Sequence, residues 1–416
     1  MWLVRFYRRI GGQVTTGTER IAELIGLNVD RPEPQVMARL VLSGRADRPI
    51  VAKILQNAVE IFATDSRWLG RLTESEFDGL TYLDGRPIVD GDEVDAALWL
   101  SRVYGAAFAP ATVGDALRAV GRENRSHPVR GYLSGLQWDG VARVDAWLSR
   151  YLSVEAGPLV ASIGRCFLLS AVARIFSPGC KVDTVLILYG GQGAGKSSAL
   201  RALGGAWFSD TPLPIGSDDV YDKIRGIWIY ELAELDAFRR AEWPQIKALI
   251  SSQSDNVRRK YARNAERTLR QSIFCGTTNK KEFLSDPSGS RRFHPVEVGA
   301  IDLAGLIADR DQLWAEAVDL YRRGLPWWLT RDEDQALASA AEEYEAVDPW
   351  FGPVARWAEG RGQVEIAAAL VEALERPKAQ HTAADAHRVA VILGELGYER
   401  KRIRSGGGRI AVWSRG

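Results

Sequence analysis

The sequence predicts an α/β fold, in which a core with a mostly parallel sheet is flanked by a mainly helical N-terminal domain and a small C-terminal domain. Short apolar runs alternate with helical patterns in the middle of the chain, which is typical of a parallel sheet. A glycine-rich loop directly follows the first of these runs. Near residue 348 the pattern changes to helices followed by a hairpin. We therefore expect domains at residues 1–123, 124–348 and 349–416.

Composition excludes several classes of protein. The 416 residues include 54 Lys and Arg against 53 Asp and Glu, so the formal net charge is +1 and any contact with nucleic acid must come from local clusters. Three widely spaced cysteines, Cys166, Cys180 and Cys275, exclude a disulfide framework and a four-thiolate zinc site. Arginines interrupt the apolar N-terminus, and the longest apolar runs are far shorter than the ~20 residues of a membrane span. We expect a cytoplasmic protein without membrane contact.

The N-terminal region indicates a packing domain and no recognisable chemistry. Asp84-Gly85 marks a turn of a predicted β-hairpin. A helix follows from Asp92, a residue suited to capping it, and residues 112–124 predict a second helix. The first helix should bury one face, formed by Ala96, Ala97, Leu100 and Val103.

The central region alternates helices and strands. The apolar spacing from Pro158 to Ile175 is helical on nearly all sides, which indicates a buried helix. The continuous apolar run Thr184–Tyr189 predicts a central parallel strand. Further strands are expected at Ile227–Tyr230 and Ser272–Cys275. This alternation predicts an α/β core.

A phosphate-binding motif follows the first strand. The pattern G-x-x-x-x-G-K-[ST] needs glycines so that backbone N–H groups can surround phosphate oxygens, and it places them at a helix N-terminus. Lys196 would reach the β- and γ-phosphates, and the Ser197 hydroxyl would bind Mg²⁺. A glycine-rich turn that binds nothing is the alternative. The residues expected to hold a nucleoside triphosphate are Gly190, Gly191, Gln192, Gly193, Ala194, Gly195, Lys196, Ser197 and Ser198.

Two acids follow the second strand. Carboxylates at the carboxyl end of a strand beside the phosphate loop lie where Mg²⁺ and the attacking water sit. We assign Glu231 to the metal and its water shell, and Glu234 to orienting or deprotonating the attacking water. The order of these two roles stays open. Solvated charges that complement a helix dipole are the alternative.

Three polar residues further along the chain complete the predicted catalytic set. Asn279 follows the third strand, where its amide would contact the γ-phosphate and the water; turn formation is the alternative. Arg291 and Arg292 lie on a predicted turn, from which an arginine could reach the nucleotide of a neighbouring subunit. An exposed basic pair is the alternative for these two residues.

A strongly basic segment lies between the second and third strands. Residues 258–270 hold six basic residues and one acid, in a chain that is nearly neutral. This excess suits a hairpin that binds a phosphate backbone, with an aromatic ring available for base stacking. A solvated charged hairpin is the alternative. The predicted DNA-binding residues are Arg258, Arg259, Lys260, Tyr261, Arg263, Arg267 and Arg270.

The segment from Asn124 to Pro295 resembles the virulence-associated protein E family of phages and mobile elements, which is similar to superfamily 3 helicases of the AAA+ class. The matching motifs occur in the family's order. They are His127-Pro128 with Tyr132-Leu133, Trp138-Asp139-Gly140 with Arg143, Pro178-Gly179 with Lys181 and Asp183, the phosphate loop, Glu231 with Glu234, Gly276–Asn279, and Gly289–Pro295.

The resemblance implies an AAA+-like P-loop core that hydrolyses ATP, forms a ring and moves DNA. It implies an arginine finger at Arg291 or Arg292, and a basic hairpin that faces a central DNA channel. It gives no role to Lys247, which falls where the family carries a lysine. The sequence departs from superfamily 3 in separating Glu231 from Glu234 by two residues. Members are often fused to a primase, which has no counterpart here, so priming would come from another chain.

The C-terminal residues predict a helix followed by a basic hairpin. Thr382 can cap a helix that ends at Gly397, and two strands flank a turn at residues 405–408. From Arg400 onward this hairpin contains basic residues and no acid. The order resembles a winged helix whose wing lies along duplex phosphates. An oligomerisation or packing module is the alternative.

These expectations combine into one predicted function. We expect a homo-oligomer, a hexamer by the resemblance, that uses ATP and Mg²⁺ as a helicase or translocase on single-stranded or forked DNA in phage or mobile-element replication. The first alternative is a DNA-binding initiator or regulatory ATPase that remodels DNA without unwinding it. A small-molecule kinase is a more distant alternative, because it would leave the basic segment unexplained.

Overall fold

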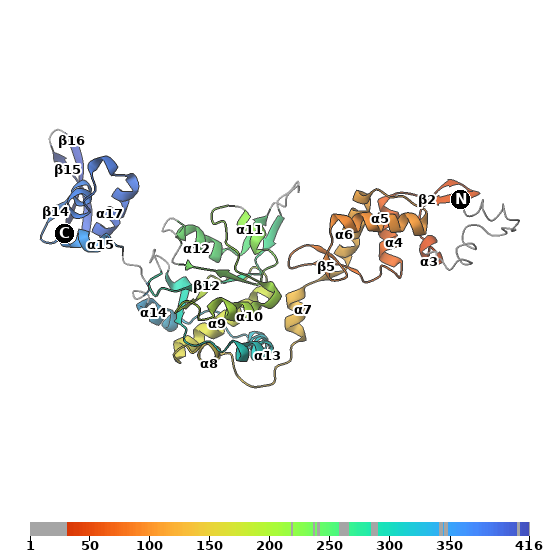
Figure 1. The fold of residues 1–416 in the computed structure, drawn as a ribbon, viewed down its shortest axis with the longest axis horizontal. Helices are drawn as coiled ribbons and strands as arrows, with labels where there is room; N and C mark the ends of the chain where they lie inside the picture. The colour runs from red at the N-terminus through yellow and green to blue at the C-terminus, as the bar shows by residue number, and fades with distance from the viewer. Residues whose placement is uncertain are drawn as a thin grey trace. The chain divides into compact units, whose positions relative to one another are not determined.

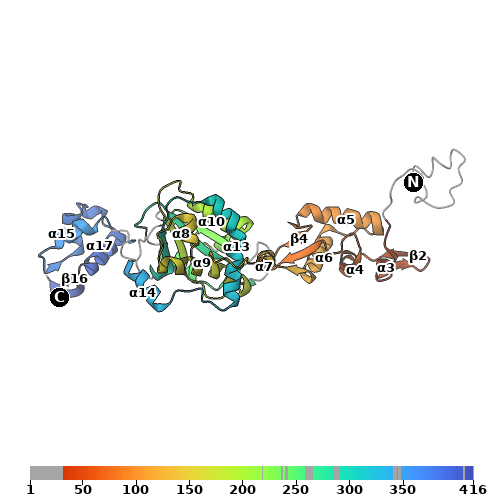
Figure 2. The ribbon, with the colours of Figure 1, turned by 90° about the horizontal axis from the view of Figure 1, so that it is seen from below.

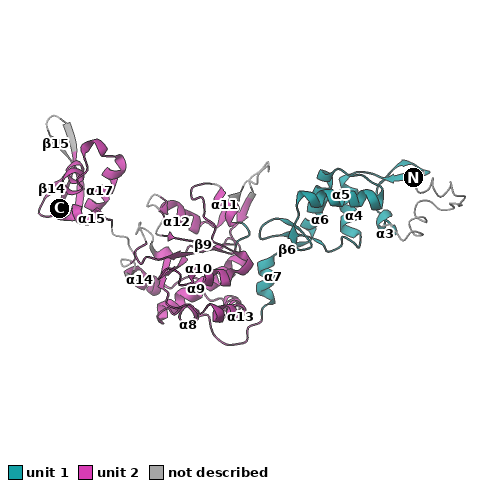
Figure 3. Ribbon diagram, in the orientation of Figure 1, with its two compact units in different colours: residues 1–136, 225–227 teal, residues 137–224, 228–416 magenta. Residues whose placement is uncertain are grey.

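The chain contains two compact units (Figures 1 and 3). A computed structural model describes residues 31–217, 219–235, 238, 242–257, 266–283, 290–340, 344, 348–405 and 408–415. Unit 1 comprises the described residues up to 136 together with 225–227, and unit 2 comprises residues 137–224 and 228–416. The boundary predicted at residue 123 lies inside unit 1, because Arg125–Ser126 forms a strand that pairs with Leu72–Ser75.

Unit 1 mixes helices with short strands. Its largest helices pack around one apolar cluster that includes the predicted Ala96, Ala97, Leu100 and Val103. Asp92 lies at the third position of its helix, where the carboxylate accepts a hydrogen bond from the Val89 N–H. The elements are α3 (Pro34–Met37), β1 (Leu42–Arg45), β2 (Arg48–Val51), α4 (Leu55–Thr64), β3 (Leu72–Ser75), β4 (Thr81–Leu83), β5 (Arg86–Pro87), α5 (Asp90–Tyr104), α6 (Pro110–Glu123), β6 (Arg125–Ser126) and α7 (Pro128–Gly135).

Unit 2 is built on a five-stranded sheet in the order β13-β7-β12-β9-β8, in which every neighbouring pair is parallel. The predicted α/β core with a parallel sheet is therefore confirmed. The elements up to residue 340 are α8 (Trp147–Leu152), α9 (Pro158–Phe176), β7 (Val185–Tyr189), α10 (Lys196–Gly204), η1 (Gly205–Trp207), β8 (Phe208–Ser209), α11 (Asp219–Ile224), β9 (Ile229–Leu232), α12 (Trp243–Ser251), β10 (Ser254–Val257), β11 (Glu266–Leu269), β12 (Ile273–Thr278), η3 (Ser290–Arg292), β13 (Phe293–Glu297), α13 (Leu303–Arg322) and α14 (Arg331–Ala340).

Helices cover both faces of this sheet (Figures 1 and 2). Side chains alternate along β13, so that Phe293 packs against Trp243 of α12 while His294 points to the opposite face, toward Phe167 of α9. α9 is the one helix among the described residues that is long and apolar enough to cross a membrane, but 72% of its apolar window is buried inside the protein. It is a core helix, as its all-round apolar pattern predicts.

The second strand begins later than its apolar pattern predicts. β9 starts at Ile229 because Trp228 turns into the helical layer, where its indole N–H donates to the Ala171 carbonyl at 2.9 Å and its ring packs on Trp314. The strand then continues to Leu232. Glu231 consequently lies inside the strand and not after it.

The C-terminal module folds around its own apolar cluster. Thr382 caps α17 as predicted, because its hydroxyl accepts from the Asp385 N–H at 3.1 Å. The predicted hairpin is also present, and a third short strand pairs with it in the order β14-β16-β15. The elements are α15 (Phe351–Ala358), β14 (Gln363–Val364), α16 (Ile366–Ala368), η5 (Ala369–Ala373), η6 (Lys378–Gln380), α17 (Ala383–Glu395), β15 (Tyr398–Ser405) and β16 (Gly408–Arg415).

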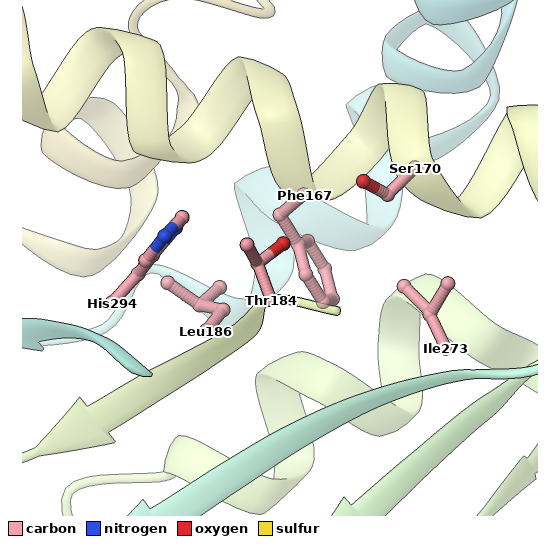
Figure 4. A pocket seen from close by; sticks show the side chains of 6 residues that line it. All are labelled: Phe167, Ser170, Thr184, Leu186, Ile273 and His294. Carbon is pink, nitrogen blue, oxygen red and sulfur yellow. The ribbon is translucent and has the colours of Figure 1, made fainter. Parts of the chain in front are cut away.

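A small internal pocket lies between α9 and the sheet (Figure 4). The strand residues that line it are near the amino ends of β7, β12 and β13, whereas the phosphate loop follows the carboxyl end of β7. The pocket is therefore separate from any nucleotide site. Its lining residues are Phe167, Ser170, Thr184, Leu186, Ile273 and His294.

His294 makes this pocket sensitive to acid. Burial lowers the pKa of the imidazole to about 4, and hydrogen bonding to the backbone at Arg291 opposes that shift. The Nε2 atom has no hydrogen-bond partner among the described residues. Because the unfolded chain takes up this proton near pH 6.5 and the folded chain only near pH 4, the group lowers stability as the pH falls through that window.

We therefore expect His294→Gln to weaken the acid sensitivity of unit 2. Between pH 7 and pH 5 the variant should lose about 2 kcal/mol less unfolding free energy than the wild type, measured by urea titration of tryptophan fluorescence. His387→Gln is the matched control, because His387 is exposed, and it should respond to pH as the wild type does. An unchanged pH response of the His294 variant would contradict this assignment.

Candidate functional site

The predicted phosphate loop joins β7 to α10. Gly193 and Gly195 adopt left-handed backbone angles, with φ of 77° and 90°, which favour glycine and turn the chain directly into the helix. The residues from Gly191 to Gly193 are exposed, and α10 begins at Lys196. The backbone N–H groups at the first turn of α10 have no partner within the helix, so this geometry suits an anion.

Glu231 lies at the centre of the site. Its side chain is 1% exposed, and its Oε1 atom accepts hydrogen bonds from the Ser197 hydroxyl at 2.6 Å and from the Thr277 hydroxyl at 2.5 Å. These three residues come from β9, from α10 and from β12. The structure thus brings together the two residues that the sequence analysis assigns to the metal.

Hydrogen bonds hold the side chain of Lys196 against the phosphate loop. Its Nζ donates to the carbonyls of Gly190 and Gly191 at 2.8 and 2.9 Å, and to Asn279 Oδ1 at 2.9 Å. Burial lowers the pKa of Lys196, while the charge of Glu231 opposes this. Asn279, the first residue after β12, is exposed and adjoins the loop.

The second oxygen of Glu231 fits a cation. Oε2 is buried and has no hydrogen-bond partner among the described residues, which is costly for a carboxylate oxygen. Within the same residues no group of three or more His, Cys, Asp or Glu side chains converges. A hydroxyl and one carboxylate are, however, the usual protein ligands of a Mg²⁺ ion that takes its remaining ligands from phosphate and water. Ser197 and Glu231 are the residues that would hold it.

Glu234 stands apart from this buried cluster. It is exposed and has a left-handed backbone, with φ of 53°. A non-glycine residue held in this conformation is uncommon, and such residues are frequent at functional sites. The structure therefore separates the two predicted acids into one that is buried and one that faces solvent.

Arg291 and Arg292 lie far from the phosphate loop of their own chain. Both belong to η3, and the next residue, Phe293, pairs with Val185 at the amino end of β7. The loop starts at Gly190, five residues along β7 and therefore about 16 Å away. Arg292 Nε donates to Ser251 Oγ at 3.1 Å, whereas Arg291 is exposed.

The basic segment is partly described. β10 and β11 form the predicted antiparallel hairpin, in which Val257 pairs with Glu266. Its tip, with Arg258, Arg259, Lys260, Tyr261 and Arg263, lies outside the described residues. Arg267 is exposed at the start of β11, and its Nε donates to Ser254 Oγ at 3.1 Å.

The assignment of Arg270 to DNA binding is wrong on structural grounds. Its side chain is 1% exposed and forms a two-fold hydrogen-bonded ion pair with Asp255, while Nη1 donates to the Leu249 carbonyl at 2.8 Å. A guanidinium with these partners is unavailable to a phosphate. Arg270 instead fixes the base of the hairpin.

Thr277 belongs to the site, although its sequence motif alone gives it no separate role. The hydroxyls of Thr277 and Ser197 both donate to Glu231 Oε1, because β12 lies between β7 and β9 in the sheet. In a parallel sheet the carboxyl ends of neighbouring strands meet at one edge. A threonine hydroxyl near the carboxyl end of β12, two residues before Asn279, is therefore the sequence feature that could have indicated this contact.

Comparisons with known proteins agree with the motifs. The sequence matches the family described as the virulence-associated protein E-like domain over residues 133–346, which is slightly more than half of the chain. No curated protein matches it.

Solved structures give only weak likenesses. One apo structure of the NrS-1 C-terminal region is 12% identical, covering 83% of this chain and 96% of that one, with a TM-score of 0.44. An A-form apo structure of the same region has 14% identity, 68% and 78% coverage and a TM-score of 0.42. A point mutant of Thermotoga maritima RuvB has 14% identity, 60% and 91% coverage and a TM-score of 0.24.

At these TM-scores the structural likenesses establish neither a shared fold nor a shared activity. The sequence match needs no such support, since it spans the sheet, the phosphate loop and the residues around Glu231. The chain belongs to the virulence-associated protein E-like family.

Proposed function

We propose that this protein is a Mg²⁺-dependent ATPase that moves single-stranded DNA in phage or mobile-element replication. The observation that carries the proposal is the buried Glu231, bonded to Ser197 and Thr277 through one oxygen and without a described partner on the other. It lies beside Lys196 and a loop suited to phosphate. Family membership supports the replication setting, and the family resemblance supports ATP as the nucleotide.

The proposed chemistry follows from the positions of the side chains. Lys196 exchanges its two carbonyl partners for phosphate oxygens, while Ser197 and Glu231 hold Mg²⁺. Bound Mg²⁺ would neutralise charge on the β- and γ-phosphates. Asn279 then faces the terminal phosphate. The solvent-facing Glu234 is the residue that would orient or deprotonate the attacking water, because Glu231 is already engaged by two hydroxyls.

The distance between η3 and the phosphate loop supports a site shared between subunits. An arginine side chain cannot cover the length of β7, so Arg291 and Arg292 do not serve the loop of their own chain. We propose that one of them reaches the γ-phosphate held by a neighbouring subunit, as arginine fingers do. This arrangement requires a homo-oligomer, and a hexameric ring would satisfy it in every subunit.

The β10–β11 hairpin is the proposed DNA contact within the ring. Its base is fixed by the Arg270–Asp255 pair, so motion of the core would be transmitted to β10 and β11. The basic residues from Arg258 to Arg263, together with the exposed Arg267, would bind the strand's phosphates, and Tyr261 would stack on a base. We place this activity in the host cytoplasm.

An initiator or regulatory ATPase that remodels DNA without unwinding it is the second candidate. The C-terminal module favours it, because we propose for it a winged-helix-like fold on the order of α17, β15 and β16. Such a module would attach the protein to duplex DNA. ATP-dependent strand displacement on a forked substrate distinguishes the two candidates, since only the translocase separates the strands.

Substitutions of the two acids should affect different steps, one nucleotide binding and the other hydrolysis. Glu231→Gln should weaken Mg²⁺-dependent nucleotide binding, because it removes the charge from the metal site. Glu234→Gln should retain that binding and lower kcat by about 100-fold or more, since it removes the group that prepares the water. Nucleotide titration with and without Mg²⁺, combined with steady-state hydrolysis, measures both effects. Full kcat in Glu234→Gln would remove this residue from the mechanism.

Mixing inactive variants tests the shared site. Lys196→Ala subunits lack a working phosphate loop but retain Arg291, and Arg291→Ala subunits have the opposite defect. Each variant should be inactive alone. A mixture should regain part of the hydrolysis activity, because some interfaces then combine an intact phosphate loop with an intact Arg291. Arg267→Ala mixed with Lys196→Ala is a control for dilution. A mixture of the first two that remains inactive contradicts a finger at Arg291.

A further inference from the structure

Helix α12 contacts the chain around the arginine-bearing turn η3 at both of its ends. At the carboxyl end, Ser251 Oγ accepts a hydrogen bond from Arg292 Nε at 3.1 Å. At the amino end, the Trp243 ring packs edge-on against Phe293, with ring centroids 5.2 Å apart. Phe293 is the first residue of β13 and directly follows η3. A displacement of η3 would therefore act on α12 as a whole.

The carboxyl end of α12 also holds the basic hairpin. Arg270, the residue after β11, donates from Nη1 to the Leu249 carbonyl at 2.8 Å and from its backbone N–H to the Gln253 carbonyl at 3.0 Å. The Ser252 hydroxyl donates to the carbonyl of Ser254, the first residue of β10, at 2.7 Å. Two residues separate the end of α12 from β10. The base of the hairpin and the end of α12 therefore form one hydrogen-bonded unit.

This unit is stiffened by the buried pair between Arg270 and Asp255. Asp255 belongs to β10, whereas Arg270 follows β11, so the pair joins the two strands at the base of the hairpin. The guanidinium is a rigid planar group, and it binds the carboxylate through two parallel hydrogen bonds. Both strands should consequently follow a movement of α12 together.

The two adjacent arginines of η3 have different surroundings. Arg292 is half-buried and its Nε atom is engaged by Ser251, whereas Arg291 is exposed. A hydrogen bond with a charged donor is about twice as strong as one between neutral groups, so the contact with Ser251 can hold Arg292 in place. Since the two residues are consecutive in a short turn, the position of Arg292 restricts the position of Arg291.

We propose that Ser251 and Arg292 are positioning residues that couple DNA on the β10–β11 hairpin to Arg291, the finger. DNA bound by one subunit sets the position of its α12 and, through Arg292, of its own Arg291. The nucleotide that responds is the one in the phosphate loop of the neighbouring subunit. The inference rests on the proposed function, because it assumes both the shared site and the DNA contact.

The test places one substitution in either of two complementary subunits. In a mixture, Lys196→Ala subunits contribute a finger and Arg291→Ala subunits contribute a phosphate loop, so hydrolysis comes only from interfaces that combine the two. Ser251→Ala is introduced into one kind of subunit at a time. The readout is the stimulation of hydrolysis, the rate with a single-stranded oligothymidylate divided by the rate of the same mixture without it. The oligonucleotide is kept above saturation, as measured by fluorescence anisotropy for each mixture.

In the Lys196→Ala subunits, which donate the finger, Ser251→Ala should lower the stimulation by about fivefold or more. The same substitution in the Arg291→Ala subunits is the matched control, and it should leave the stimulation at the value of the unsubstituted mixture. Ser251→Thr keeps the hydroxyl and should restore the stimulation in the finger-donating subunits.

Equal losses in the two placements would identify Ser251 as a structural residue and overturn the proposal. An unchanged stimulation with Ser251→Ala in the finger-donating subunits would overturn it as well, and so would a loss confined to the loop-donating subunits. A mixture without any change at Ser251 that hydrolyses no ATP would instead contradict the shared site, and the inference would fall with it. The failure of the coupling is thereby distinguished from the failure of the proposed function.

Discussion

The structure of the site depends on one buried carboxylate. Glu231 would be costly to bury alone, and two hydroxyls from different elements satisfy one of its oxygens. Ser197 reaches it from the first turn of α10, so the phosphate loop, β12 and β9 are tied together at a single atom. The other oxygen is buried and has no hydrogen-bond partner among the described residues, which suits the phosphate-bound cation that we propose for this site. Lys196 completes the arrangement and donates a hydrogen bond to Asn279.

Sheet topology separates the other proposed functions in space. The phosphate loop follows the carboxyl end of β7. In contrast, η3 directly precedes β13, whose first residue pairs with the amino end of β7. We propose that contact between subunits brings one of these arginines to the nucleotide. The basic β10–β11 hairpin is anchored by a buried ion pair between Arg270 and Asp255. A nearly neutral chain thus carries two basic hairpins, one in the core and one in the C-terminal module, and we propose that the first binds single-stranded DNA.

Local patterns predicted those elements whose signals lie within a few residues. The glycine-lysine-serine spacing predicted the turn into α10, and Thr382 predicted the start of α17 with a hydroxyl that caps it. Local patterns do not reveal the role of a residue that depends on a distant partner. Arg270 belongs to a run of basic residues in the sequence. Its hydrogen-bonded pair with Asp255 becomes visible only when β10 pairs with β11 in the structure. Thr277 gains its role because β12 is inserted between β7 and β9, an order that the linear sequence does not express. The packing of Trp228 against Trp314 is another contact with a distant partner. Because of it, β9 begins two residues later than its apolar pattern predicts.

The central claim is that the cluster around Glu231 accepts a nucleoside triphosphate together with Mg²⁺. Isothermal titration of the wild-type protein with a non-hydrolysable ATP analogue tests it most directly, once in Mg²⁺ and once in a chelator. We predict saturable binding in Mg²⁺ and an affinity lower by tenfold or more without it. Equal affinity in both conditions would remove the metal from the site, and no binding in either would contradict the claim altogether.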